Sequence, residues 1–162
     1  MLSTIYAWSL DHIKRVFEAK TTLECLRALD ETFSQHIEFT MNGMQLPRIG
    51  LQRTVLAMVE ASGYRLAVDW QNAVEVPKDP SNRNGVLGGY YIIRNVTKHL
   101  PGSAAPLLCE RHKSINVVIE SEHPDANSDS RRIVKLALVA TDLPVQTSFL
   151  SQRAGTVVEH QT

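Results

Sequence analysis

Apolar residues in the first sixty positions recur every three or four residues, which is the spacing of amphipathic helices. The first helix is predicted over residues 4–19 by the stripe Ile5, Trp8, Ile13, Val16 and Phe17. A second begins at residues 21–24, where a glutamate three positions after a threonine forms a capping box. A third is predicted over about 49–61, after a short extended segment at 36–43.

After residue 63 the period changes to two, which is typical of half-buried strands. Four strands are predicted, over 64–76, 86–98, 107–120 and 131–142, with a bulge or bend expected at Gly88 and Gly89. Helices followed by a strand meander indicate a segregated α+β fold. We expect a cone-shaped α+β barrel in which three N-terminal helices pack on a curved antiparallel sheet of four to six strands. Residues 1–150 form one domain in this prediction, and the polar residues 151–162 form a flexible tail.

Composition narrows the class of protein. The chain has 162 residues, enough for one domain with a core, and its 17 basic and 17 acidic residues balance. No basic stripe accompanies the aromatic residues, which argues against a nucleic-acid partner. Two cysteines beside apolar residues indicate buried, reduced thiols. No secretory leader or membrane span is evident, so we expect a soluble cytoplasmic protein with no membrane partner.

The predicted strand 107–120 carries the most chemistry. Its alternation places His112, Ser114 and Asn116 on one face, and Arg111 and Lys113 on the other among apolar residues. A titratable ring beside a hydroxyl and an amide is suited to a polar pocket. The alternative is that this face is simply solvated, as one side of an antiparallel sheet often is.

Familiar catalytic and metal-binding motifs are absent, including Walker, GxGxxG, HExxH, CxxC and GxSxG sequences. We therefore expect no metal and no cofactor. Any reaction would proceed by acid–base catalysis in a pocket that is shielded from solvent. His112 is the first candidate for proton transfer, because it titrates near neutral pH. Asp69 and Tyr91 are further catalytic candidates. Asn116 and Ser114 would orient a substrate oxygen.

Four more residues are candidates for lining a substrate pocket. They are Trp70 on the first strand, Arg94 on the second, Tyr6 on the first helix and His36 at the start of the short extended segment. Only one of Tyr90 and Tyr91 can line a cavity, because adjacent strand residues point to opposite faces. The basic residues Arg111, Lys113, Arg131 and Arg132 are interpreted as a solvated edge or a dimer rim.

The order of elements over about 5–142 resembles the nuclear transport factor 2-like superfamily, including its SnoaL-like polyketide cyclase branch. Ser114-Ile115-Asn116 and Tyr6-Ala7-Trp8 are similar to Ser-x-Asn and Tyr-x-Trp segments of the scytalone dehydratase family. The Tyr-Asp pair of that family is His12-Ile13 here, so this chain departs from the dehydratases.

The segment 36–47 resembles small fungal SnoaL-like proteins of natural-product pathways, although Thr40 stands where a second proline is expected. The resemblance implies cofactor-free isomerisation, cyclisation or rearrangement of polyketide or terpenoid intermediates. It also implies a homodimer.

We therefore predict a cofactor-independent cyclase, isomerase or dehydratase that holds an apolar, oxygenated substrate in the cone cavity. His112, with Asp69 or Tyr91, would move the proton, and Asn116 and Ser114 would stabilise negative charge on a carbonyl oxygen. The alternative is a non-catalytic binding or dimerisation module, in which side chains fill the cone and the outer sheet face pairs with a partner. Epoxide hydrolysis by Arg94, Asp69 and Asp142 is a weaker alternative.

Overall fold

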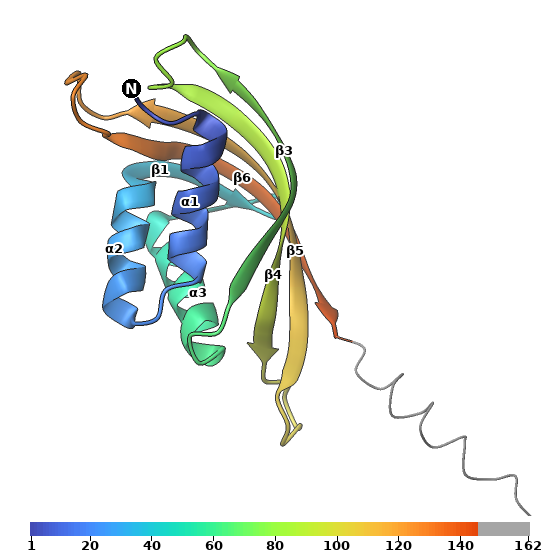
Figure 1. Cartoon of the computed structure of the whole chain (residues 1–162). Coiled ribbons are helices and arrows are strands. Elements are labelled where there is room, and N and C mark those ends of the chain that lie inside the picture. The colour runs from blue at the N-terminus through green and yellow to red at the C-terminus, as the bar shows by residue number, and fades with distance from the viewer. Residues whose placement is uncertain (146–162) are drawn as a thin grey trace, which may run out of the picture.

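The computed structural model describes residues 1–145 as three helices packed on one face of a curved sheet (Figure 1). Residues 146–162, which include the predicted 151–162 tail, lie outside the described part. The helices are α1 (Ile5–Phe17), α2 (Thr22–Thr32) and α3 (Arg48–Ala61). The strands are β1 (Phe33–Met41), β2 (Met44–Leu46), β3 (Ala67–Pro77), β4 (Gly85–Lys98), β5 (Leu107–Ser121) and β6 (Arg131–Pro144).

The strand order is β2-β1-β6-β5-β4-β3, and β3 to β6 form the predicted meander. All neighbouring strands are antiparallel except β1 and β6, which are parallel. The three-helix α+β fold is thus confirmed, with a six-stranded sheet that is mixed and not purely antiparallel. β1 pairs with β6 although β2, α3 and the strands β3 to β5 separate them in the chain.

Local sequence signals explain where the helices begin. The Thr4 hydroxyl accepts a hydrogen bond from the Ala7 amide at the start of α1, and the Thr21 hydroxyl does the same for Glu24 at α2. The Glu24 carboxylate in turn accepts a bond from the Lys20 amide, close to the predicted capping box. Gly63 has a φ of 67° after α3, the left-handed conformation expected there.

Bulges bend the long strands, although not at the predicted position. Register shifts occur between Trp70 and Asn72 in β3 and between Ile93 and Val96 in β4. Asn95 in the second bulge has a φ of 68°. Gly88 and Gly89 pair regularly with both neighbouring strands, so the bulge expected there is wrong.

The face of the sheet that the helices cover is called the inner face, and its opposite the outer face. In β5 the inner face carries Ile115, Val117 and Ile119, which belong to a single core with α1, α2 and α3. Cys25 and Cys109 are both buried and unpaired, as predicted. Burial raises the pKa of the Cys25 thiol to about 11, which keeps this thiol protonated and unreactive at neutral pH.

Candidate functional site

The space between the helices and the inner face is almost filled. A small cavity of about 20 Å³, here called the inner cavity, lies among Phe17 of α1, Leu51 of α3, Tyr91 of β4, and Lys113 and Ile115 of β5. That volume holds about one water molecule. The expected enclosed substrate cavity in the cone is therefore wrong for this conformation, because core side chains occupy it.

His112, Ser114 and Asn116 do share a face, as their alternation predicts, but it is the outer face. The intervening residues Ile115 and Val117 are buried against the helices. The placement of the polar trio in the cone is thus wrong. The alternation along β5 correctly separates its residues onto two opposite faces. The helices cover the face that carries Ile115 and Val117, not the face that carries the polar trio.

On the outer face, five polar side chains from three strands form a connected row. Arg94 Nη2 donates to Asp69 Oδ2 at 2.7 Å, and Arg94 Nη1 donates to Glu110 Oε1 at 2.8 Å. Glu110 Oε2 lies 3.5 Å from His112 Nε2. His112 Nδ1 shares a short hydrogen bond with the Tyr90 hydroxyl. The hydrogen bond that Arg94 donates to Asp69 is the main cause that raises the pKa of Arg94.

This row brings together three predicted site residues, His112, Asp69 and Arg94. Asp69 lies on the polar side of β3 and Trp70 on the inner side, as the alternation indicated. A hydrogen bond joins the Tyr90 hydroxyl to the His112 ring, and the guanidinium of Arg94 forms an ion pair with each of the two carboxylates beside it. The roles in catalysis assigned to these residues remain predictions.

Beside the row lies an open groove of about 570 Å³ on the outer face, here called the outer groove. Tyr90, Ser114 and Asn116 line it together with Val74 of β3 and Val139 of β6. Gly88 and Gly89 form its floor. Ser114 and Asn116 therefore line an open depression on the outer face, and their role in binding a substrate remains a prediction.

The remaining predicted residues lie elsewhere. Trp70 and Tyr91 pack together on the inner side with ring centroids 4.6 Å apart, and Tyr91 is the tyrosine that faces the cone. Tyr6 is exposed near the start of α1, where its amide donates to Glu75. His36 is exposed on β1. Neither Tyr6 nor His36 lines the inner cavity or the outer groove.

Lys113 is a chemical group that the sequence interpretation missed. It is 6 % exposed, not on a solvated edge, and its Nζ lies 4.5 Å from the centroid of the Phe17 ring. Burial, and then the charge of Arg111, lower the pKa of Lys113 to about 7. The sequence places Lys113 on the same side of β5 as Ile115 and Val117, but it does not by itself show which side the helices cover.

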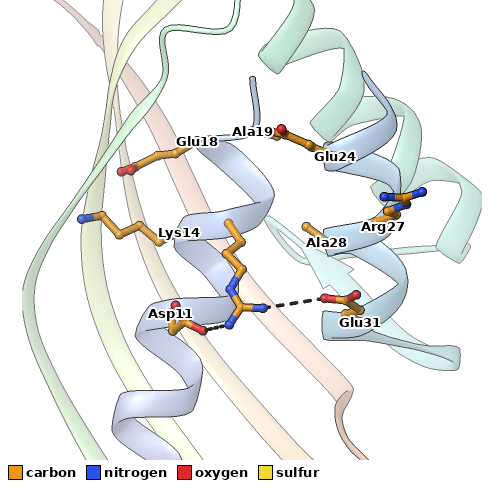
Figure 2. A pocket seen from close by; sticks show the side chains of 9 residues that line it. Asp11, Lys14, Glu18, Ala19, Glu24, Arg27, Ala28 and Glu31 are labelled. Carbon is orange, nitrogen blue, oxygen red and sulfur yellow. Dashed lines mark hydrogen bonds and ion pairs between the residues drawn. The ribbon is translucent and has the colours of Figure 1, made fainter. Parts of the chain in front are cut away.

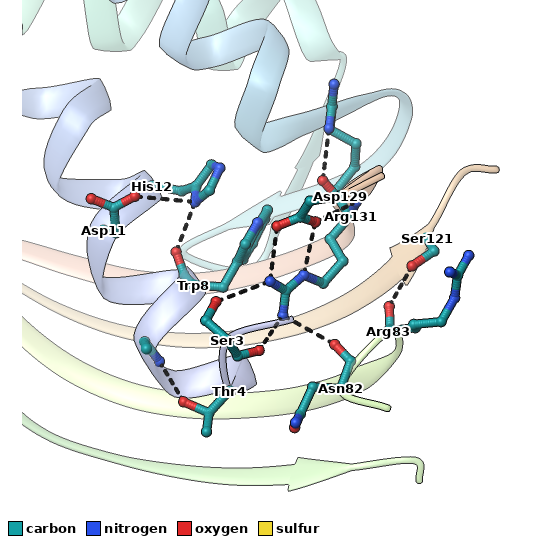
Figure 3. A network of polar contacts seen from close by, with 12 residues as sticks. Ser3, Thr4, Trp8, Asp11, His12, Asn82, Arg83, Ser121, Asp129 and Arg131 are labelled. Carbon is teal, nitrogen blue, oxygen red and sulfur yellow. Dashed lines mark hydrogen bonds and ion pairs between the residues drawn. The ribbon is translucent and has the colours of Figure 1, made fainter. Parts of the chain in front are cut away.

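Arg131 is the other basic residue that was wrongly assigned to a solvated edge. It is fully buried, and Figure 3 shows its guanidinium between Asp129, Ser3 and Asn82. Asp129 accepts two bonds of 2.9 Å, and the carbonyls of Ser3 and Asn82 accept bonds of 2.7 and 3.0 Å. This network joins the N-terminal segment to two loops, which is a structural role.

A charged groove of about 450 Å³ lies between α1 and α2 (Figure 2). Arg15 bridges it, with a short ion pair to Asp11 and a 3.7 Å contact to Glu31. Its charged side chains are mixed in sign, and its apolar lining residues are the alanines Ala19 and Ala28, so we assign no chemistry to it.

No family model matches the chain, and no curated protein matches it. Solved structures do. The beta subunit of benzoate 1,2-dioxygenase from Burkholderia mallei has 13 % identity and a TM-score of 0.55, over 87 % of this chain and 93 % of that one. Mtr2 of Candida albicans has 12 % identity and a TM-score of 0.55, over 83 % and 92 %. This chain has the nuclear transport factor 2-like, cystatin-like fold.

A third match is an uncharacterized protein of cystatin-like fold from Caulobacter vibrioides, with 11 % identity and a TM-score of 0.54 over 91 % and 94 % of the two chains. This fold agrees with the resemblance inferred from element order. Proteins with the fold include an enzyme subunit, and the likeness is one of architecture alone. Within residues 1–145, no helix is long and apolar enough to cross a bilayer. No cluster of three potential metal ligands occurs in that range either.

Proposed function

We propose that this protein is a binding module that forms a homodimer through the outer face of its sheet. The observation that carries the proposal is a set of valines exposed on that face while the cone is filled. Val139 is 65 % exposed and Val74 is 75 % exposed, on opposite sides of the outer groove. Exposed apolar side chains that cluster around a depression favour a protein partner.

The register of the strands extends this apolar surface. Val86 of β4 pairs directly with Val76 of β3 and with Val118 of β5, which makes a continuous valine row across three strands. A symmetric dimer places the same patch of each copy against the other. A second copy is the favoured occupant because no Asp, Glu, Lys or Arg lines the outer groove, so two identical grooves do not repel through like charges.

A structural neighbour supports an assembly role, since the benzoate 1,2-dioxygenase chain is a subunit by name. In the proposed dimer, Gly88 has no side chain where it faces the outer groove, which leaves room for side chains of the partner. The polar row from Asp69 to Tyr90 then lies at the rim of the interface, where charged groups contribute more to specificity than to affinity.

Sedimentation velocity over a range of protein concentrations tests this proposal. We expect a dimer for the wild type, and a monomer for Val74→Glu and Val139→Glu. Leu23→Glu is the matched control, because Leu23 is 57 % exposed on α2, away from the sheet. A wild type that sediments as a monomer at all concentrations, or a Leu23→Glu variant that dissociates equally, contradicts the proposal.

A second candidate function is cofactor-free acid–base catalysis on an apolar, oxygenated polyketide or terpenoid intermediate in the outer groove. The specific observation in its favour is the bond between His112 and Tyr90, whose hydroxyl lines the groove beside Ser114 and Asn116. His112 would accept a proton through Tyr90, and the Asn116 amide would bind an enolate oxygen.

Exchange of the α-protons of 2-tetralone in D₂O, followed by proton NMR, measures this activity without knowledge of the natural substrate. We expect His112→Ala to lower the exchange rate by ~10²–10⁴ if His112 acts as the base. His36→Ala is the control, since His36 does not line the groove. Exchange that is no faster than buffer, or that is equal in both variants, excludes this chemistry.

A further inference from the structure

The polar row on the outer face holds two carboxylates against one guanidinium. Asp69 and Glu110 each form an ion pair with Arg94, at 2.7 and 2.8 Å. With both carboxylates ionised, these three side chains leave one negative charge in excess. The two remaining members of the row are His112 and Tyr90, which share a hydrogen bond. The net charge of the row at neutral and mildly acidic pH therefore depends on whether the ring of His112 is protonated.

The two ring nitrogens of His112 have different neighbours. Nε2 lies 3.5 Å from Glu110 Oε2, and Nδ1 shares a short hydrogen bond with the Tyr90 hydroxyl. A hydrogen on Nε2 is attracted by the carboxylate, so Glu110 favours the neutral form in which Nδ1 accepts a bond from Tyr90. A second proton, on Nδ1, requires only that the Tyr90 hydroxyl rotate so that its oxygen becomes the acceptor. The ring therefore gains its charge without losing either contact.

The charged groups that face the ring of His112 are members of the row itself. Its register partners on the neighbouring strands are uncharged, namely Ile92 on β4 and Thr141 on β6. The helices α1, α2 and α3 lie on the inner face and bring no charge to it (Figure 1). Ile92 is only 8 % exposed although it is not part of the core, because the row flanks it on the outer face. The carboxylate of Glu110, with Arg94 beyond it, thus dominates the electrostatic surroundings of the ring.

We propose that His112 is a pH switch for the homodimer, so that two copies associate more tightly as the medium becomes acidic. This inference rests on the proposed dimer through the outer face. When the ring is neutral, each copy brings a negatively charged row to the rim of the interface, and the two rows repel each other. When the ring is protonated, the row has no net charge, and removing it from water against the partner costs less.

The same proton changes the hydrogen bonds that the outer groove offers to a partner. Tyr90 lines this groove, and its hydroxyl donates to the neutral ring of His112. Once Nδ1 carries a proton, the hydroxyl hydrogen turns away from the ring and is free to donate. In a symmetric dimer the partner presents the same groove, in which Asn116 and Ser114 carry acceptor oxygens. The new donor and the loss of excess charge both favour the dimer at acidic pH.

Sedimentation velocity of the full chain at pH 7.5 and pH 5.5, at constant ionic strength, measures the Kd of the dimer in both states. Histidine is the side chain whose ordinary pKa lies in this range. We expect the Kd of the wild type to be about five-fold lower at pH 5.5, the effect of one charge interaction between partly exposed groups. A wild type that is monomeric at both pH values contradicts the dimer itself. A dimer with the same Kd at both pH values contradicts the switch alone.

Two variants of the row separate its charge from other effects of acid. His112→Gln keeps the row negative throughout, so its Kd should stay at the higher, pH 7.5 value at both pH values. Glu110→Gln removes the excess charge without a proton. It should therefore dimerise at pH 7.5 about as tightly as the wild type does at pH 5.5, and it should weaken on acidification because its row then becomes positive.

His36→Gln is the matched control, because His36 is exposed on β1 and lies outside the row. This variant should keep the pH response of the wild type. The proposal is overturned if His112→Gln still dimerises more tightly at pH 5.5, or if His36→Gln loses the response. Because Glu110→Gln reports on the same charge, it decides the matter even where His112→Gln fails to fold.

Discussion

The amine of Lys113 lies 4.5 Å from the centroid of the Phe17 ring, so that a strand and a helix meet through a lysine and an aromatic face. Such contacts usually involve a charged lysine near solvent. Here the lysine is buried, and its ordinary protonation is displaced toward the neutral form. The stability of the protein therefore depends on pH in a range where most proteins show little change.

Lys113→Met should stabilise the protein at neutral pH. The folded-state pKa is about 7 and the unfolded value is about 10.5, so the unfolded state binds the extra proton between these values. The wild-type free energy of unfolding should therefore rise from pH 7 to pH 10, with a total contribution of a few kcal/mol at most, ~1.4 kcal/mol for each pKa unit. Urea unfolding at pH 7, 8.5 and 10 measures it. A variant with the same pH slope as the wild type contradicts the assignment.

The wild type should lose stability as the pH falls below about 6.5, and His12→Phe should remove this loss. The ring of His12 stacks on Trp8 with centroids 4.1 Å apart, and its Nδ1 bonds to the Trp8 carbonyl. Burial is the main cause that lowers the pKa of His12. Below the unfolded value of about 6.5, the unfolded state binds a proton more readily, so the wild type loses stability as pH falls.

This effect is read as the difference between two unfolding curves. The free-energy gap between wild type and His12→Phe should shift in favour of the variant from pH 7.5 to pH 5.5. A phenylalanine ring at position 12 can still stack on Trp8, but it has no group that binds a proton in this pH range. His99→Phe is the control, since His99 is exposed. If the free energy of unfolding depends on pH equally in the wild type and in His12→Phe, the prediction is wrong.

Gly89→Ala should destabilise the fold while Gly88→Ala leaves it nearly unchanged. A Cβ at Gly89 would lie 2.7 Å from Cζ3 of Trp70, an aromatic packed against Tyr91. A Cβ at Gly88 meets only the carbonyl oxygen of Ile115, at 3.9 Å. Overpacking of a well-packed core typically costs about 1–3 kcal/mol. Thermal unfolding of the two variants, measured side by side, checks the contrast between adjacent residues.

Arg131→Met should cost about 1–3 kcal/mol in the free energy of unfolding, because it removes the donor that Asp129 and the carbonyls of Ser3 and Asn82 share. The same truncation at Arg27, which is exposed on α2, should change stability by less than about 0.5 kcal/mol. Chemical denaturation of both variants gives the comparison. Similar costs at the two positions would show that the Arg131 network contributes little.

Much of the fold was available in the sequence because local periodicity records which side of an element is buried. The stripe from Ile5 to Phe17 lies in the core, and Thr21 begins the second helix where expected. The parallel pairing of β1 with β6 was not available, since it joins segments about one hundred residues apart and depends on the path of the whole chain.

For the candidate site too, the sequence determined one part of the arrangement and the tertiary structure determined the other. Alternation alone determined that His112, Ser114 and Asn116 lie opposite Lys113 and Ile115. It did not determine which set the helices cover, because His112 and Lys113 are both polar and either face could have met solvent. Only the packing of α1 and α3 decided this. Burying Ile115, Val117 and Ile119 removes more apolar surface from water than burying the polar trio, and it carries Lys113 into the core with them.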